Sequence, residues 1–182
     1  MESGESSYRR YLDGDEAAFD DILRLYRHRL TFFIYRFVQD LDAAEDLAID
    51  TFMHLIVHPH RYNFKTPLKA YLFMIGRSRA LDYLKHRKKY TMVDLKQVEE
   101  IPSDDVTLEE LILLTERKQQ LSRALLQLPD EMQTVIHLVY FEDFSYENAA
   151  RVMKKSRKQV ANLLYRGKEK LRIILGKDGA VI

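Results

Sequence analysis

The chain has 182 residues, a formal net charge of +1 and no cysteine. This length allows one ordinary domain or two small ones. The absence of cysteine excludes disulfides, a thiol nucleophile and cysteine-ligated zinc or iron–sulfur sites. No segment reaches the roughly twenty apolar residues of a membrane span, and the N-terminus lacks the apolar core of a signal peptide. We therefore expect a cytoplasmic protein without membrane insertion.

Helical periodicity with few glycines and prolines predicts an all-α protein. Three amphipathic helices are predicted before residue 90, at residues 15–37, 42–57 and 68–87. Because three such helices can bury one another's apolar faces, we expect residues 15–90 to form one domain. Residues 1–14 are expected to be an N-terminal tail.

Residues 91–107 mix acidic residues with proline and serine and show no sustained period, which predicts a linker. The second expected domain, residues 108–182, contains helices predicted at residues 108–128, 130–141, 145–154 and from 157 onward. Ser145 and Ser156 are expected to cap the last two helices. A short helix, a three-residue turn and a second helix are typical of a helix-turn-helix. The predicted fold is thus two small helical domains joined by a linker, the C-terminal one a helix-turn-helix.

The last predicted helix separates its apolar and basic residues onto opposite faces. At about 100° per residue, one sector holds Val160, Leu164, Gly167 and Leu171. The opposite sector holds long hydrogen-bond donors, the residue types that reach phosphates and base edges. We predict that this helix reads duplex DNA through Arg157, Lys158, Gln159, Asn162 and Arg166. The alternative is a basic face that only meets solvent.

A second basic block lies on the third predicted helix, after a stretch in which aromatic residues alternate with cations. This composition favours unpaired nucleic acid, because bases stack on rings while Lys and Arg hold the backbone. For Tyr62, Phe64 and Tyr71 taken singly, packing in the core beneath a loop is the favoured alternative. His54 and His58 stand one helical turn apart without a suitable third ligand, so we expect no metal and no cofactor.

Three segments follow one another along the chain: DAAEDLAIDTF, TPLKAYLFMIGRSRALDYLKHRKK and LPDEMQTVIHLVYFEDFSYENAARVMKKSRKQVANLLYRGKEKLR. In this order and spacing they resemble the extracytoplasmic-function (ECF) type of bacterial RNA polymerase sigma factor, in the sigma-70 family. The resemblance covers about residues 15–90 and 108–175, which match the family's second and fourth conserved regions. It implies a promoter-specificity factor, not an enzyme, that binds core RNA polymerase and promoter DNA and helps to melt the DNA. It also implies an anti-sigma factor as a partner.

The resemblance assigns residues to three surfaces. The helix predicted at residues 42–57 is rich in acidic residues. The resemblance implies that it docks on the largest polymerase subunit through Asp42, Glu45, Asp46, Asp50 and Phe52. The loop at residues 60–66 and the third predicted helix are expected to hold the melted minus-ten element. The residues concerned are Arg61, Tyr62, Asn63, Phe64, Lys65, Tyr71, Arg77, Ser78, Arg79, Lys85 and Arg87. The five donors of the last helix are expected to read the minus-thirty-five element.

Some positions depart from the family's usual residues. They are Ile49 for glutamine, Tyr71 for tryptophan, Ser78 for asparagine, Gln133 for arginine, and Lys154 and Lys155 for the glycine and aliphatic residue of the turn. Gln133 is expected to remove one phosphate contact. Lys155 is expected to lay its stem over the core and keep its charge outside.

Two other functions remain open from the residues alone. A stand-alone helix-turn-helix regulator would bind palindromic duplex DNA as a dimer, but it leaves the acidic helix and the aromatic block without a role. A helical adaptor would dock an acidic protein on its basic helix. Binding of promoter DNA with and without core polymerase distinguishes these functions from a sigma factor.

Overall fold

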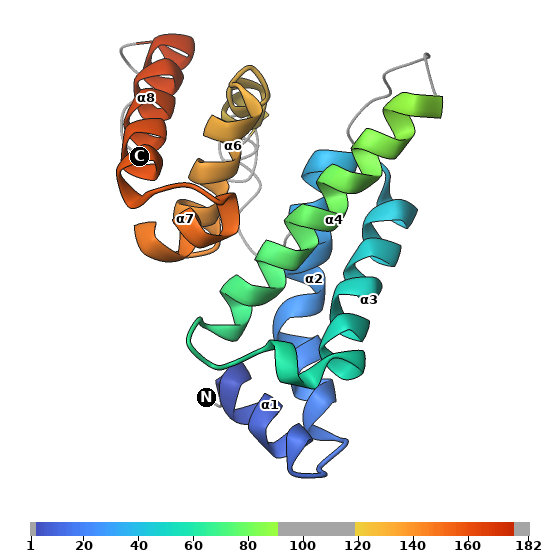
Figure 1. Cartoon of the computed structure of the whole chain (residues 1–182). Helices are drawn as coiled ribbons and strands as arrows, with labels where there is room; N and C mark the ends of the chain where they lie inside the picture. The colour runs from blue at the N-terminus through green and yellow to red at the C-terminus, as the bar shows by residue number, and fades with distance from the viewer. Residues whose placement is uncertain (1–2, 91–118, 177–182) are drawn as a thin grey trace, which may run out of the picture. The chain divides into compact units, whose positions relative to one another are not determined.

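The computed structural model describes residues 3–90 and 119–176 of the chain. Every regular element within these two ranges is helical, as the sequence predicts (Figure 1). The chain divides into two compact units. The predicted linker, residues 91–107, and the first part of the helix predicted from residue 108 lie outside the described residues. None of the described helices combines the length and apolar composition needed to span a bilayer.

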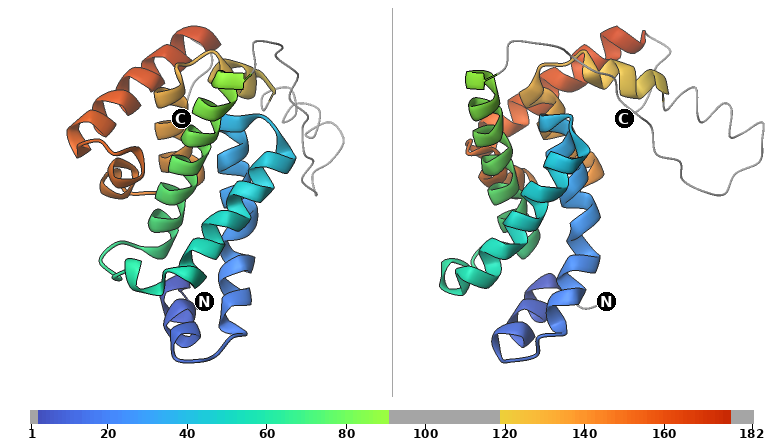
Figure 2. Two further views of the ribbon diagram at one scale, coloured as in Figure 1. Left: turned by 45° about the vertical axis from the view of Figure 1, so that its right-hand side comes forward. Right: turned by 90° about the vertical axis from the view of Figure 1, so that its right-hand side faces the viewer.

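The described part of the first unit, residues 3–90, contains four α-helices and one short 3-10 turn. They are α1 (Gly4–Leu12), α2 (Ala18–Val38), α3 (Leu41–Val57), η1 (Pro59–Arg61) and α4 (Leu68–Tyr90). Helices α2, α3 and α4 pack against one another in the views of Figures 1 and 2, while α1 contacts α2 and the start of α4. The three predicted helices are confirmed close to their predicted positions.

The apolar stripes of α2, α3 and α4 meet in a shared core. Ile22, Leu30, Leu55 and Leu72 are fully buried there. The rings of Phe33 and Phe73 lie 4.8 Å apart between α2 and α4. The Asp40 side chain caps α3 by accepting a hydrogen bond from the Ala43 amide at 3.1 Å. This core holds α3 and α4 side by side, so that each helix presents its other face outward.

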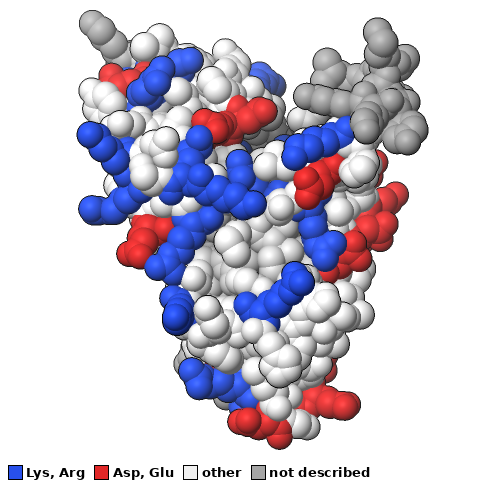
Figure 3. Space-filling view, in the orientation of Figure 1, with Lys and Arg blue, Asp and Glu red and all other residues white. Residues whose placement is uncertain are grey.

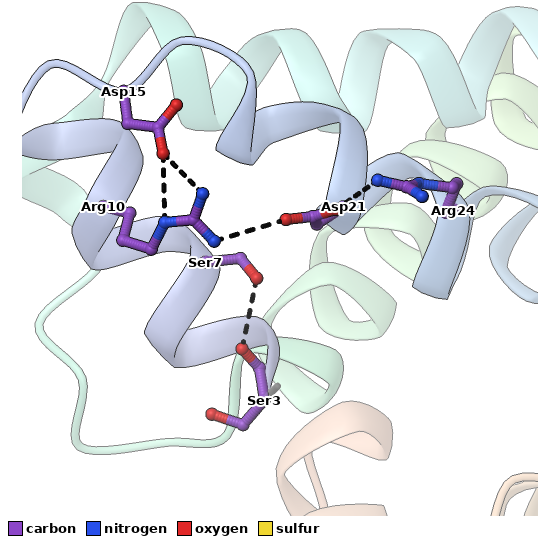
Figure 4. A network of polar contacts seen from close by, with 6 residues as sticks. All are labelled: Ser3, Ser7, Arg10, Asp15, Asp21 and Arg24. Atoms are coloured by element: carbon purple, nitrogen blue, oxygen red, sulfur yellow. Dashed lines mark hydrogen bonds and ion pairs between the residues drawn. The ribbon is translucent and has the colours of Figure 1, made fainter. Parts of the chain in front are cut away.

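Helix α1 lies within the segment expected to be a tail, and the sequence analysis did not place it. It is anchored to the unit by Tyr8, which is fully buried and donates a hydrogen bond to the Leu55 carbonyl at 2.9 Å. Figure 4 shows a second anchor, in which Arg10 lies between Asp15 in the turn and Asp21 on α2. Residues 4–12 are therefore part of the folded first unit.

The described part of the second unit begins with helical residues 119–126. It continues with α6 (Asp130–Ile136), the π-turn η2 (His137–Phe141), α7 (Tyr146–Met153) and α8 (Arg157–Leu175). The predicted helix 130–141 is confirmed, but it widens at its end, where the Glu142 amide donates to the His137 carbonyl. The predicted caps are also confirmed, because the hydroxyls of Ser145 and Ser156 accept hydrogen bonds from the Asn148 and Gln159 amides.

Helix α8 docks on α6 through the apolar sector predicted from its sequence. The buried residues of α8 are Val160, Leu164, Gly167 and Leu171. A Cβ atom at Gly167 would lie 3.0 Å from Ile136 Cδ1 and 3.4 Å from Met132 Cβ. Glycine therefore lets the two helices approach closely at this point. The opposite face of α8 is exposed.

Candidate nucleic-acid interface

A capping box fixes the start of α8. The Ser156 hydroxyl accepts from the Gln159 amide at 3.2 Å, and the Gln159 side-chain oxygen accepts from the Ser156 amide at 2.8 Å. The helix therefore starts at Arg157, with its first cations in the first turn. Gln159 was predicted to contact DNA, but its oxygen is engaged in the cap, which leaves only its amide nitrogen for another partner.

The outward face of α8 carries positive charge without compensation. Arg157, Lys158, Asn162 and Arg166 are all exposed. Within the part of the chain that the structure describes, no carboxylate lies within ion-pair distance of these three cations. The one acid of α8, Glu169, instead pairs with Arg172 one turn on. Since nothing internal neutralises this face, it is suited to a polyanion.

The turn before α8 accommodates the two lysines that depart from the family pattern. Lys154 has φ of 53°, in the left-handed region, which explains why glycine is usual at this position. The Lys155 stem is mostly covered, as expected, with 21% of the side chain exposed, and its ammonium lies 2.7 Å from Glu131. The Gln133 side chain donates to the Leu128 carbonyl at 2.8 Å, so it ties α6 to the end of the preceding helix.

The loop before α4 is built around buried aromatic rings. Tyr62 is only 4% exposed, its ring lies 4.7 Å from that of Phe64 and 5.0 Å from that of Tyr71, and its hydroxyl donates to the Thr66 carbonyl at 2.7 Å. Burial raises the pKa of Tyr62 and of Tyr71. The Tyr62 ring therefore packs in the core and supports the loop from inside, as the favoured alternative expected, and the DNA contact that the resemblance implied for this ring is corrected.

Other residues of this loop remain accessible. Arg61, Asn63 and Lys65 are exposed, while Phe64 and the neighbouring Tyr71 on the first turn of α4 are half-buried. The Asn63 side-chain oxygen accepts from the Lys65 amide at 3.1 Å, which closes a tight turn between them. The loop thus presents two cations, one amide and the edges of two rings on a supported frame.

The predicted contact residues of α4 are less free than those of α8. Arg77, Ser78 and Arg79 are half-buried, and Lys85 and Arg87 are exposed. A guanidinium nitrogen of Arg79 lies 3.3 Å from Asp50 on α3, and Lys85 lies 3.4 Å from Asp82. Figure 3 shows basic side chains along α4 and acidic ones on the side of α3. The basic face of α4 therefore borders directly on the acidic face of α3.

The outward face of α3 combines acids with apolar residues. Asp42, Glu45, Asp46 and Asp50 are exposed as predicted. Phe52 is only 3% exposed, so its predicted contact with polymerase is corrected, because the ring belongs to the core. Sequence reasoning missed the exposed apolar residues Ile49, Met53 and Ile56 on this face. Their spacing of four and three residues, outside the buried stripe, was the available signal.

His54 and His58 lie close together at the end of α3. The His54 and His58 rings lie 4.9 Å apart, and the described ranges contain no group of three or more His, Cys, Asp or Glu side chains that could hold a metal. Burial lowers the pKa of His54, and neighbouring His58, Arg79 and Arg61 lower it further. Its surroundings therefore oppose a positive charge on this ring.

Comparison with known proteins identifies the two units. Family models match residues 22–90 as "Sigma-70 region 2" and residues 118–171 as "Sigma-70, region 4". "ECF RNA polymerase sigma factor SigM" of Bacillus subtilis is 26% identical over 87% of this chain and 95% of its own length. "RNA polymerase sigma factor CarQ" of Myxococcus xanthus is 29% identical over 92% of this chain and 95% of its own.

A solved structure agrees with these relatives. The sigma factor RpoE of Bartonella quintana, in complex with the anti-sigma factor NepR, has a TM-score of 0.69 and 25% identity, covering 86% of this chain and 96% of that one. The alternatives of a stand-alone regulator and an adaptor are not favoured, because both conserved regions are present in family order. The chain therefore belongs to the ECF-type sigma factors of the sigma-70 family.

Proposed function

We propose that this sigma factor reads the minus-thirty-five element as duplex DNA with the outward face of α8. The observation that carries the proposal is the exposed, uncompensated row of Arg157, Lys158 and Arg166 opposite a fully buried apolar sector. Asn162 lies on the same outward face and can pair with an adenine edge in the major groove. The apolar side holds the helix rigidly on α6, so that its donors are held in place on a stable element.

The minus-ten element is assigned to the loop and to α4. Arg61, Asn63 and Lys65 provide donors, and Phe64 and Tyr71 provide ring edges for an unpaired base. Capturing a flipped base offsets part of the cost of unpairing, which is a few kcal/mol. The cations of α4, Arg77, Arg79, Lys85 and Arg87 with Ser78 between them, would then hold the backbone of the melted strand.

The acidic and apolar face of α3 is assigned to core RNA polymerase. Exposed carboxylates beside Ile49, Met53 and Ile56 suit a partner helix that is basic and partly apolar. Two DNA-binding units on one chain raise each other's effective concentration, so each contact can be weak alone. We infer that the polymerase supplies all catalysis and that the protein works beside it in the cytoplasm.

An anti-sigma factor is the proposed regulatory partner. The similar sigma factor RpoE was solved in complex with the anti-sigma factor NepR. The exposed apolar residues of α3, which a polymerase would cover, are also a surface that an inhibitor could occupy in competition.

Promoter binding with and without core polymerase tests the proposal. A sigma factor is expected to retard promoter DNA specifically only when core polymerase is present. Specific binding of palindromic DNA by the chain alone would contradict it, and so would absence of DNA binding in both cases.

Asp46→Arg tests the polymerase surface. Asp46 is exposed, so charge reversal should weaken capture by core polymerase while the fold remains intact, because an exposed acid contributes at most about 1 kcal/mol to stability. Pull-down with core polymerase measures capture, and circular dichroism measures folding. Asp20→Arg on α2, also exposed, is the matched control. Equal capture of the Asp46 variant and wild type would remove the assignment of α3.

A further inference from the structure

Helix α1 precedes the segment matched as region 2 and packs against the loop assigned to the minus-ten element. The Tyr8 ring lies 5.6 Å from that of Tyr62 and 6.0 Å from that of Phe64. Its hydroxyl is fixed on the Leu55 carbonyl near the end of α3. Tyr8 is therefore a buried support that joins the loop to the helix bundle behind it.

Glu5 of α1 provides a second link, at the point where the loop becomes α4. Its carboxylate accepts a hydrogen bond from the Leu68 amide at 2.7 Å. The first turn of α4 contains no acidic residue of its own, so a distant helix provides the negative charge that a helix N-terminus favours. A Cβ atom at Gly4 would collide with the Tyr26 side chain, so glycine lets α1 approach α2 closely enough for this contact.

Arg9 provides the third link, and it reaches the surface. The Arg9 guanidinium carbon lies 4.3 Å from the centroid of the Phe64 ring, and Arg9 is exposed. Phe64 has φ of 60°, in the left-handed region that bulky residues rarely adopt. Such a conformation persists only where its surroundings hold it. The contacts that hold this ring come from Tyr62 within the loop and from Tyr8 and Arg9 of α1.

We propose that α1 is a positioning element of the minus-ten site, in which Arg9 acts through Phe64 and Glu5 acts through Leu68. Together they hold the loop in the single conformation that accepts a flipped base. A loop that is already ordered loses less conformational entropy on binding, and it distinguishes bases more sharply because its donors do not shift to fit the wrong one. This inference rests on the proposed function of the loop.

The test measures base preference with the complete holoenzyme. Full-length wild type and variants, each assembled with core polymerase, are mixed with a library of random-sequence single-stranded DNA, and the retained strands are sequenced. Wild type should enrich particular bases at several positions. Arg9→Ala should reduce the preference by about threefold at the position facing Phe64, since it removes an exposed cation–π contact, and leave the other positions unchanged.

Conservative variants separate positioning from charge alone. Arg9→Lys should recover part of the preference, because an ammonium over the ring keeps some of the attraction. Glu5→Ala should also reduce the preference, and Glu5→Gln should recover it, because the side-chain oxygen can still accept from Leu68. Arg24→Ala is the matched control, because Arg24 is exposed on α2 and pairs with Asp21 rather than touching the loop.

The outcomes distinguish this inference from the function on which it rests. Absence of any base preference in wild type would overturn the assignment of the loop itself. Clear preference in wild type that is unchanged in Arg9→Ala would overturn the role of α1 alone. Equal weakening at all positions would also overturn it, because Arg9 would then be a simple phosphate contact. If circular dichroism shows that the Glu5→Ala variant does not fold, the Arg9→Ala variant decides the test, because Arg9 is exposed and its replacement leaves the fold intact.

Discussion

The two basic helices, α8 and α4, hold their cations in different ways. Arg157, Lys158 and Arg166 of α8 stand exposed, and no described carboxylate pairs with them. On α4, Arg79 is half-buried and paired with Asp50, and Lys85 lies beside Asp82. The cations of α8 keep their full charge for an external partner, whereas Arg79 and Lys85 of α4 are partly compensated by nearby carboxylates, and Arg79 also links α4 to α3.

This difference fits the two forms of DNA. A duplex presents rigid phosphate rows and base edges, so a helix with free donors on a fixed axis can read it without changing shape. A melted strand is flexible and needs a supported surface that shapes it. The internal pairs of α4 and the aromatic core under residues 61–66 provide such a surface. The expected effects below test this comparison, in decreasing order of size.

The largest effect is expected where α8 docks on its own unit. Leu164 is 3% exposed, so Leu164→Ala should cost about 2–5 kcal/mol of unfolding free energy in the second unit. Denaturant unfolding of the full chain measures this loss. Binding of duplex DNA by the holoenzyme should fall, while binding of single-stranded minus-ten DNA persists. Tyr165→Ala, at a neighbouring exposed position, is the control, and equal stability of the two variants would refute the docking role.

A smaller effect is expected from the outward cations of α8. Lys158→Ala and Arg166→Ala should each lower duplex affinity and reduce the slope of log affinity against log salt by about one, as expected for one lost phosphate contact. Stability should not change, because both side chains are exposed. Fluorescence anisotropy of the holoenzyme on promoter DNA at several salt concentrations measures both quantities. Arg172→Ala, whose partner is Glu169, should keep the wild-type slope; slopes unchanged in all variants would reject the DNA-facing assignment.

The pair on α4 should have a still smaller effect. A double-mutant cycle on Asp50→Ala and Arg79→Ala should give a coupling free energy of about 0.2–1 kcal/mol, typical of an accessible ion pair. Chemical denaturation of the single and double variants measures it. Zero coupling would mean that Arg79 is as independent as Lys158, and the distinction between the helices would be lost at this position.

The smallest effect concerns the pKa of His54, which depends on the cations beside it. Its pKa is lowered chiefly by burial and further by His58, Arg79 and Arg61. Between the lowered folded value and the ordinary unfolded value of about 6.5 the unfolded chain binds more protons, so stability falls as pH is lowered through this window. Arg79→Ala should raise the pKa of His54, as followed by NMR titration of the imidazole protons. An unchanged titration would show that Arg79 does not influence His54.

The sequence predicted the helices that have a clear period and missed contacts between distant segments. The buried stripe of α8 and its cap at Ser156 followed directly from the spacing of residues. Tyr62 and Phe52 were assigned to partners, but both rings are buried. In the loop around Tyr62 there is no period to show which side chain points inward.

Other features had a weaker signal or none. The SRKQ pattern at residues 156–159 contains the capping box, so the engagement of Gln159 could have been inferred. Helix α1 is short and mostly polar, and its partners Leu55, Phe64 and Leu68 lie far along the chain. Periodicity alone does not reveal an element that is stabilised by tertiary contacts.

The close contact at Gly167 sets how near α8 lies to α6. Because Ile136 Cδ1 would lie 3.0 Å from an added methyl group, alanine at this position would require either the Ile136 side chain to shift or the axis of α8 to move outward by a few tenths of an ångström. In the second case every outward donor would move with the axis, although none had been replaced. We therefore expect promoter preference to respond to Gly167→Ala, a change at the rear of the helix that the proposed DNA-binding face does not include.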